Sequence, residues 1–391
     1  MIKFFFPQDK KIFKEIVFLS YPVVLSNISR VLMSIFDVAM VGRLGSEALA
    51  ATGMGGMLVW APMSMALGIR TAVQTVSSRR LGQKKEEESS KAFHNGLIMA
   101  TVFAFPVTLI GWVYADQIVP LFLEDKTTIV LAVEYTSIAF ISLLFSVYSF
   151  VFVGFYTGVE KTKIHMTVTI VSNIINLYLN AALIYGSEGI DLFFREVLPS
   201  LSFLKVAWEW TYFPAMGVKG AAFATLVASV WMAAHYGFYL FSKEIKARFN
   251  IFSFSFNKEM MRKQLQLAIP MGVQECIIAF GWTFFLKVVG IIGVVELATT
   301  HIIFTIMHAS FMPAMGIGMA CSTLVSKYMG ENKTNKSVSS IKESVRLAEY
   351  GMGTLGISFI LFPEFYLSLF TNDLSIIKMG GIGLRVVGAL Q

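Results

Sequence analysis

Long blocks of apolar residues with almost no charge recur along the whole chain, and they restrict its fold more than any other feature. A helix needs about 20 consecutive apolar residues to cross a bilayer, and only helices or closed barrels can span lipid. The blocks are too long for barrel strands. We therefore expect an all-α integral membrane protein with about ten spans, at residues 16–41, 52–78, 92–115, 130–156, 164–187, 217–242, 264–289, 297–325, 342–362 and 375–391.

The composition agrees with a chain that lies mostly in lipid. Of its 391 residues, 55% are hydrophobic and only 15% are charged, and the mean hydropathy is +0.67. A soluble domain carries about 25% charged residues, so this chain has too few charges to cover a globular surface in water. Its two cysteines, Cys276 and Cys321, lie in apolar blocks without CxxC spacing, so neither a metal site nor a disulfide framework is expected.

Basic residues alternate between loops. They concentrate in the N-terminal segment and in the loops 79–91, 161–163, 243–263 and 327–342, while the intervening loops hold few. Because Lys and Arg mark cytoplasmic loops, this pattern predicts a multi-pass protein of the cell inner (plasma) membrane with a cytoplasmic N-terminus. These loops account for the net charge of +7, so no nucleic-acid partner is expected, and the protein is expected to be a monomer in the lipid bilayer.

The sequence repeats itself after 248 positions without a gap. The shift places glycine on glycine, proline on proline and aspartate on aspartate at turns and helix starts: Pro22 on Pro270, Gly45 on Gly293, Gly68 on Gly316, Gly82 on Gly330 and Asp125 on Asp373. Six spans separate equivalent positions, and an even number keeps both copies in the same orientation. The repeat predicts two six-helix bundles, residues 1–242 and 243–391, related by a pseudo-two-fold axis along the membrane normal. Bundles so related can enclose a central cavity and rock to expose it to alternate sides.

The second copy stops within its fourth helix, because Gln391 corresponds to Leu143. About ten of twelve helices are then present. We interpret the sequence as a fragment of a longer protein in preference to a chain that has lost its last helices.

Several segments resemble the multidrug and toxic compound extrusion (MATE) family. The first helix and turn of that family are similar to YPVVLSNISRVLMSIFDVAMVGRLGSEALAATG (21–53), and its seventh helix is similar to IPMGVQECIIAFGWTFFLKVVGIIGVVELATTH (269–301). Its fifth and sixth helices resemble SNIINLYLNAALIYG (172–186) and FPAMGVKGAAFAT (213–225). The resemblance implies twelve helices in two lobes and export of organic, often cationic, compounds in exchange for Na⁺ or H⁺. The loop 187–212 is longer than the family pattern and has enough apolar residues for an outward-facing interfacial helix.

Asp37 is the first candidate for a coupling site. A carboxylate within a span is costly and is kept away from lipid, although a position near the outer interface would leave it merely hydrated. The resemblance implies that Asp37 binds the coupling cation. Asn173, Asn176 and Asn180 share one helical stripe, and Asn180 reaches the depth of Asp37. Oxygens of this kind suit Na⁺, and the carboxylate alone would suit H⁺; alternatively the amides only link helices. Of the three, Asn176 and Asn180 match the family pattern.

Glu275 is the candidate in the second lobe, as a proton carrier or as the counter-charge of a cationic substrate. The repeat places it opposite Asn27. A structural partner such as Gln274 or Arg30 is the alternative for its carboxylate. Arg30 lies in the middle of the first span and needs a partner on another helix or contact with water. Arg70 and Lys287 are expected to lie near span ends and to extend toward the interface.

The leading hypothesis is a Na⁺- or H⁺-coupled antiporter for small organic compounds, without a cofactor. A lipid-linked saccharide flippase of the same superfamily is the alternative, but it needs a cavity basic enough for pyrophosphate. A membrane-embedded enzyme is a third possibility, yet the sequence has no P-loop, GxSxG or HExxH motif. We therefore expect a transporter and no enzymatic activity.

Overall fold

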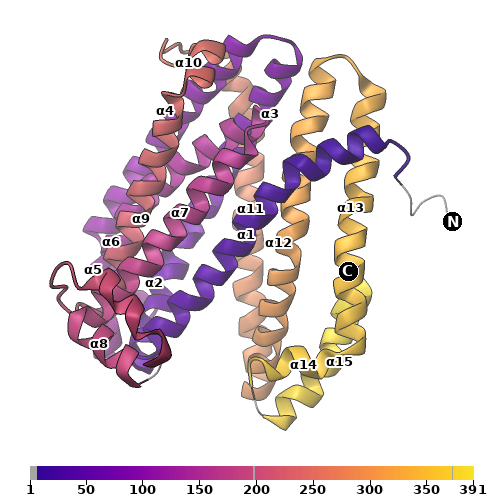
Figure 1. Ribbon diagram of the computed structural model, residues 1–391. Helices are drawn as coiled ribbons and strands as arrows, with labels where there is room; N and C mark the ends of the chain where they lie inside the picture. Colours follow the sequence, from indigo (N-terminus) through magenta and orange to yellow (C-terminus); the bar gives the residue numbers. More distant parts are fainter. Residues whose placement is uncertain (1–6, 197–198, 372) are drawn as a thin grey trace.

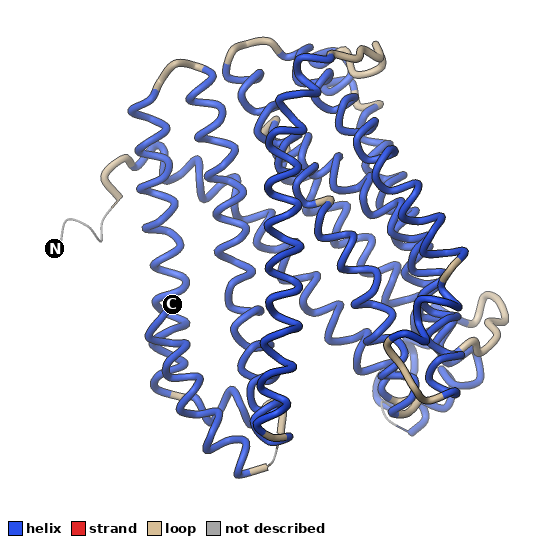
Figure 2. The backbone as a smooth tube through the Cα atoms, turned by 180° about the vertical axis from the view of Figure 1, so that it is seen from behind, coloured by secondary structure: helices blue, strands red, loops and turns tan. Residues whose placement is uncertain are grey.

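The computed structural model describes residues 7–196, 199–371 and 373–391, and within these ranges the chain forms helices and loops without strands (Figures 1 and 2). The helices are α1 (Lys10–Gly42), α2 (Ser46–Met65), α3 (Leu67–Gly82), α4 (Glu86–Val113), α5 (Ala115–Ile118), η2 (Val119–Leu121), α6 (Lys126–Gly158), α7 (Thr162–Asn180), η3 (Ala181–Tyr185), α8 (Gly186–Glu196), η4 (Pro199–Trp208), α9 (Gly217–Leu240), α10 (Lys243–Phe249), α11 (Lys258–Ile292), α12 (Val294–Gly330), α13 (Thr334–Leu361), α14 (Pro363–Ser368) and α15 (Leu374–Leu390).

In the described part of the chain, eight helical segments are long and apolar enough to cross a membrane. They correspond to the first eight expected spans. The last two expected spans coincide with α13 and α15. Helix α13 carries several charged residues in its first half, and α15 has only 17 residues, which explains why neither belongs to the eight. The chain is thus an all-α, multi-pass membrane protein.

The internal repeat extends to individual helix boundaries. A shift of 248 positions superposes Ser46–Gly82, which comprises α2 and α3, on α12, and it superposes α4 on α13. Asp125 and Asp373 both cap a helix, α6 and α15, with the side chain. Even the left-handed backbone of Lys84, with φ of 60°, recurs at Asn332, with φ of 58°. These correspondences confirm the predicted duplication.

The helices form two groups, which Figure 1 shows with the early helices on the left and α12 to α15 on the right. The first helix of each copy crosses to the other group. The start of α1 packs with Ile12, Ile16 and Leu19 against Leu324 and Tyr328 of α12, while its later half contacts α7. In the same way, the start of α11 packs against α3. The two groups are therefore joined by two crossing helices that the repeat relates to each other.

Glycines allow these helices to approach closely, and they occur at equivalent positions in the two copies. A Cβ atom on Gly68 would lie 2.1 Å from the carbonyl oxygen of Ala268 in α11, and one on Gly316 would lie 3.0 Å from the backbone nitrogen of Val24 in α1. A shift of 248 positions exchanges the two sides of this contact almost residue for residue. An interface in which each copy presents the same surface to the other is expected around a two-fold axis. In this protein the two copies belong to a single chain.

The long loop 187–212 contains two short helices, α8 and η4, where a single interfacial helix was expected; residues 197–198 lie outside the described residues. Its end is fixed to α7. The Trp208 ring stacks on the Tyr178 ring with centroids 5.1 Å apart, and the Trp210 Nε1 donates to the Tyr178 hydroxyl over 2.6 Å. The insertion therefore covers the end of the helix that carries Asn176 and Asn180.

Candidate functional site

The structure brings Asp37 of α1 together with Asn180 and Asn176 of α7. Asn180 Nδ2 donates to Asp37 Oδ1, and also to Asn176 Oδ1 over 3.4 Å. Both asparagines are buried, whereas Asp37 is half-buried. The equal depth predicted for Asp37 and Asn180 agrees with this contact. We call these three residues the carboxylate–amide cluster.

Among the described residues, two polar atoms of the cluster have no partner. Asn180 Oδ1 and Asn176 Nδ2 are both buried without a hydrogen bond. An unsatisfied buried group is costly, and such groups call for a ligand, an ion or a water. One carboxylate and two amide oxygens form a donor set that suits a hard cation such as Na⁺, which prefers oxygen ligands. The residues present therefore fit a small cation.

The backbone changes immediately after Asn180. The α-helix widens into a π-helical turn, Ala181–Tyr185, which ends at Gly186 with φ of 67°. The Tyr185 hydroxyl donates to the carbonyl of Met40 over 2.6 Å and so ties this turn to the end of α1. Single π turns occur frequently at functional sites. This turn could not be predicted from the sequence, because its residues are ordinary helix formers.

Two of the amides expected to support the site instead link helices. Asn173 Nδ2 donates to Ser29 Oγ over 2.8 Å, and Asn27 Nδ2 donates to the carbonyl of Met312 in α12 over 3.1 Å. Each bond joins α1 to a neighbouring helix, and the second one connects the two groups. Gln274 of α11 is exposed.

Arg70 interacts electrostatically with Arg30 and with Glu275. His165 is within electrostatic range of both arginines. Arg70 thus differs from the expectation that it would extend toward a membrane interface. The reason is that the span Ser46–Gly82 continues for 12 residues beyond Arg70, so Arg70 lies in mid-span and not at a span end.

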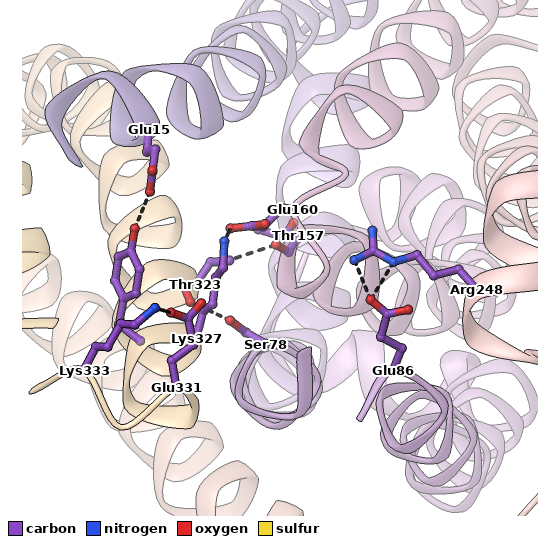
Figure 3. Close-up of polar contacts among 11 residues, drawn as sticks. Glu15, Ser78, Glu86, Thr157, Glu160, Arg248, Thr323, Lys327, Glu331 and Lys333 are labelled. Atoms are coloured by element: carbon purple, nitrogen blue, oxygen red, sulfur yellow. Dashed lines mark hydrogen bonds and ion pairs between the residues drawn. The ribbon is translucent and has the colours of Figure 1, made fainter. Parts of the chain in front are cut away.

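A polar network connects the two groups near the end that carries the basic loops (Figure 3). Its centre is Lys327 of α12, which forms an ion pair with Glu160 at 2.6 Å. One helical turn away, Thr323 donates to the carbonyl of Thr157, and its own carbonyl accepts from Ser78. We call these five residues the latch.

Further contacts surround the latch at the same end. The Tyr328 hydroxyl donates to Glu15 of α1, and Lys333 pairs with Glu331 in the adjacent turn. The guanidinium of Arg248 reaches Glu86 at 2.6 Å. This last pair belongs to the first group alone (Figure 3), so it stiffens the group without joining it to the other.

Comparisons with known proteins agree with the architecture. The MatE family model matches residues 22–182 and 270–391, and these two matches start at positions that the repeat makes equivalent. The "Probable multidrug resistance protein NorM" of Thermotoga maritima is 24% identical over 399 residues, which cover 100% of this chain and 80% of that protein. The protein of the same name from Photorhabdus laumondii is 26% identical, over 93% of this chain and 75% of its own.

Solved structures share the fold. A multidrug resistance MATE family transporter of the MOP superfamily, in an outward-facing conformation, superposes with a TM-score of 0.82 and 21% identity, over 96% of this chain and 78% of that chain. A MOP superfamily transporter from Pyrococcus furiosus superposes with the same TM-score and coverage and with 22% identity. Together with the two family matches, these findings establish that the chain belongs to the MatE family, the multidrug and toxic compound extrusion transporters, and is not an enzyme.

Proposed function

We propose that this transporter is a cation-coupled antiporter that exports small organic, often cationic, compounds by alternating access. The moving parts in this proposal are the lobes 1–242 and 243–391, with the N-terminus and the latch on the cytoplasmic side of the plasma membrane. The names of the NorM relatives support multidrug export, and the alternation of basic loops supports the orientation.

The carboxylate–amide cluster carries the proposal of cation coupling. Asp37 combines a charge, partial exposure and two buried amides, one of which has an acceptor oxygen without a partner among the described residues. In our proposal Na⁺ or H⁺ reaches Asp37 from outside. The bound cation removes the cost of a lone carboxylate in the membrane, and this favours the state that releases substrate outward. Glu275 serves as the proton carrier or counter-charge of the second lobe.

The test of cation coupling is Asp37→Asn in the complete protein reconstituted in liposomes. The change keeps size and hydrogen bonding but removes the charge, so export of a cationic dye driven by a Na⁺ or H⁺ gradient should fall to background. Asp116→Asn is the matched control, because Asp116 is an exposed carboxylate of α5. Running the two gradients separately identifies the coupling ion. Unchanged export by Asp37→Asn would remove the proposed site.

A further inference from the structure

Helix α11, which begins the second copy, has two different faces at its start. Gln264 and Ala268 are buried, and Gln264 donates to the carbonyl of Ala92 in the first group over 2.9 Å. Residues three or four positions apart share one face of a helix, and the face opposite these two residues is exposed. It consists of Lys258, Arg262, Leu265 and Ile269. The start of α11 follows α10 at the end of the molecule with the basic loops (Figure 1).

A surface groove of about 1000 Å³ lies on this exposed face. Lys258 and Arg262 line it at the start of the helix, and Leu265 and Ile269 line it farther along, together with Met261. At 1.5 Å per residue, Ile269 lies about 10 Å beyond Arg262 along the helix. The groove therefore has a basic mouth, which continues into an apolar part.

The two cations at the mouth of the groove are not paired with carboxylates. Within the described residues, neither Lys258 nor Arg262 forms an ion pair or a hydrogen bond. Glu259 also lines the groove, but its carboxylate is paired with Lys263 at 2.5 Å. The mouth of the groove therefore keeps two uncompensated positive charges.

The first copy of the repeat has the same exposed face. A shift of 248 positions places Lys10 on Lys258, Lys14 on Arg262, Val17 on Leu265 and Tyr21 on Ile269. These four residues of α1 are all exposed, and among the described residues no ion pair involves Lys10 or Lys14. Helices α7 and α9 pack against α1 and still leave this face open. An open face with two cations followed by apolar residues is therefore common to both crossing helices.

We propose that the groove on α11 binds one anionic phospholipid of the surrounding bilayer. Lys258 and Arg262 contact its phosphate, and an acyl chain lies along Leu265 and Ile269. Clusters of Lys and Arg at a membrane surface attract anionic lipids, and the long side chains of both residues reach the headgroups from a helix in the membrane. The site goes beyond the proposed export function and rests on it only for the leaflet, which is the inner one if the N-terminus is cytoplasmic.

The apolar part of the groove favours a lipid over a soluble phosphate. A soluble anion would contact the two cations alone and would leave Leu265 and Ile269 uncovered. An acyl chain covers them, and the burial of this apolar surface adds to the affinity. The order of the residues, with the cations at the start of the helix and the apolar side chains beyond them, matches the order of headgroup and acyl chain in a bilayer.

The test measures which phospholipid lies in the groove of the complete protein in nanodiscs. A bimane label on Gln266→Cys, in a background without Cys276 and Cys321, reports on the groove because Gln266 lines it and is exposed. Phosphatidylglycerol and phosphatidylcholine, each with a nitroxide on the acyl chain, quench this label. Mixtures with unlabelled phosphatidylcholine give the relative affinity of the two lipids. We expect a preference of about five- to tenfold for phosphatidylglycerol.

Substitution of the two cations should remove this preference. Lys258→Gln and Arg262→Gln should each lower it about two- to fivefold, and the double variant should bind the two lipids within about twofold of each other. Lys243→Gln is the matched control, because Lys243 is an exposed cation of α10 at the same end and does not line the groove. It should keep the full preference. Thermal unfolding should be unchanged in all of these variants, since each replaces an exposed side chain.

Equal quenching by the two lipids in the wild type would overturn the proposal, and so would a preference that the double variant retains. A preference that Lys243→Gln also loses would belong to the overall charge of this end and would contradict a site in the groove. If inorganic phosphate displaced the nitroxide lipid as well as unlabelled phosphatidylglycerol does, the site would bind a soluble anion and not a lipid.

The outcome does not depend on the proposed coupling or orientation. The nanodisc offers both lipids in both leaflets, and binding needs no ion gradient. A preference for phosphatidylglycerol without gradient-driven export would contradict the antiporter and leave this site in place. Gradient-driven export without any preference would do the reverse.

Discussion

Single glycines determine how closely the two copies approach near the latch. A Cβ atom on Gly82 would lie 2.0 Å from the carbonyl oxygen of Lys327, and one on Gly330 would lie 2.2 Å from the carbonyl oxygen of Arg79. The obstacle is backbone in both cases, so no side chain can move aside. The two contacts are equivalent under the repeat, which predicts that they contribute alike.

Gly82→Ala and Gly330→Ala should each destabilise the closed latch by about 1–3 kcal/mol, the usual cost of overpacking. Thermal unfolding of the protein in detergent measures the loss. The control is Gly237→Ala in α9, where a Cβ would meet nothing within 4 Å. That change should be neutral or stabilising by about 0.5–1 kcal/mol, because alanine is the better helix former. Equal effects at Gly82 and Gly237 would contradict the close approach.

The capping aspartates predict how stability depends on pH. The backbone N–H of Thr128, followed by its hydroxyl, holds the pKa of Asp125 below its usual 3.8, and Ser375 acts in the same way on Asp373, its hydroxyl first. A carboxyl with a lowered pKa in the folded state stabilises that state above pH 3.8. This contribution is lost as the pH falls below 3.8 and through the folded pKa.

Unfolding temperatures measured between pH 3 and pH 6 should therefore fall toward acid, and less steeply in Asp125→Asn and Asp373→Asn than in the wild type. Asparagine still caps a helix but does not titrate. If the unfolding temperature changed with pH equally in the wild type and in both variants, neither capping aspartate would contribute to the pH dependence of stability.

At the scale of helices, the latch joins α3 and α12 to the end of α6 and to the loop that follows it. The Lys327–Glu160 pair is partly screened, with side-chain exposures of 22% and 28%. Lys327→Gln should make the closed end open more often. A maleimide reagent should then label Thr157→Cys, in a background without Cys276 and Cys321, about two to five times faster. Thr157 is fully buried in the closed latch.

Lys333→Gln provides the control for this experiment. Lys333 forms an exposed pair with Glu331 within the second group alone, so its loss should leave the labelling rate unchanged. A latch that contributes nothing would show the same rate in wild type, Lys327→Gln and Lys333→Gln.

The helices themselves were largely predictable from sequence. The glycines and prolines of the repeat placed the second copy correctly, because each marks a turn or a close approach that side chains would block. Asp37 and Asn180 could be placed at one depth because both helices run through the membrane from the same side. Hydropathy therefore predicts where the helices lie, and the spacing of residues along a helix predicts their depth in the membrane.

Interactions between helices were less predictable. Asn173 and Asn180 lie on the same stripe of α7, yet Asn173 pairs with Ser29 and Asn180 with Asp37. The span that contains Arg70 continues to Gly82, so Arg70 lies in mid-span, although Pro62 and Gly68 on either side of the break at Ala66 are the residues that signal an interrupted helix. Which partner a polar side chain meets depends on helix rotation and crossing, which a single sequence does not encode in its periodicity.

The described helices of the molecule form two groups, and the first helix of each copy of the repeat crosses into the other group. Because α1 and α11 each cross into the other group, we expect the two proposed lobes to tilt about the crossing without separating fully. Cation binding at Asp37 can then be transmitted directly, since α1 carries Asp37 near one end and packs on α12 near the other. Tilting should open one end as it closes the other.

The most direct test of this account is to measure two distances by double electron–electron resonance in the complete protein. Spin labels at Glu87 and Asn335 report on the end with the latch, and labels at Leu121 and Leu369 report on the opposite end; each pair is exposed and equivalent under the repeat. The account predicts that Na⁺ or a change of pH shifts the two distances in opposite directions and that Asp37→Asn abolishes the response. Distances that change together, or that respond equally in Asp37→Asn, would contradict it.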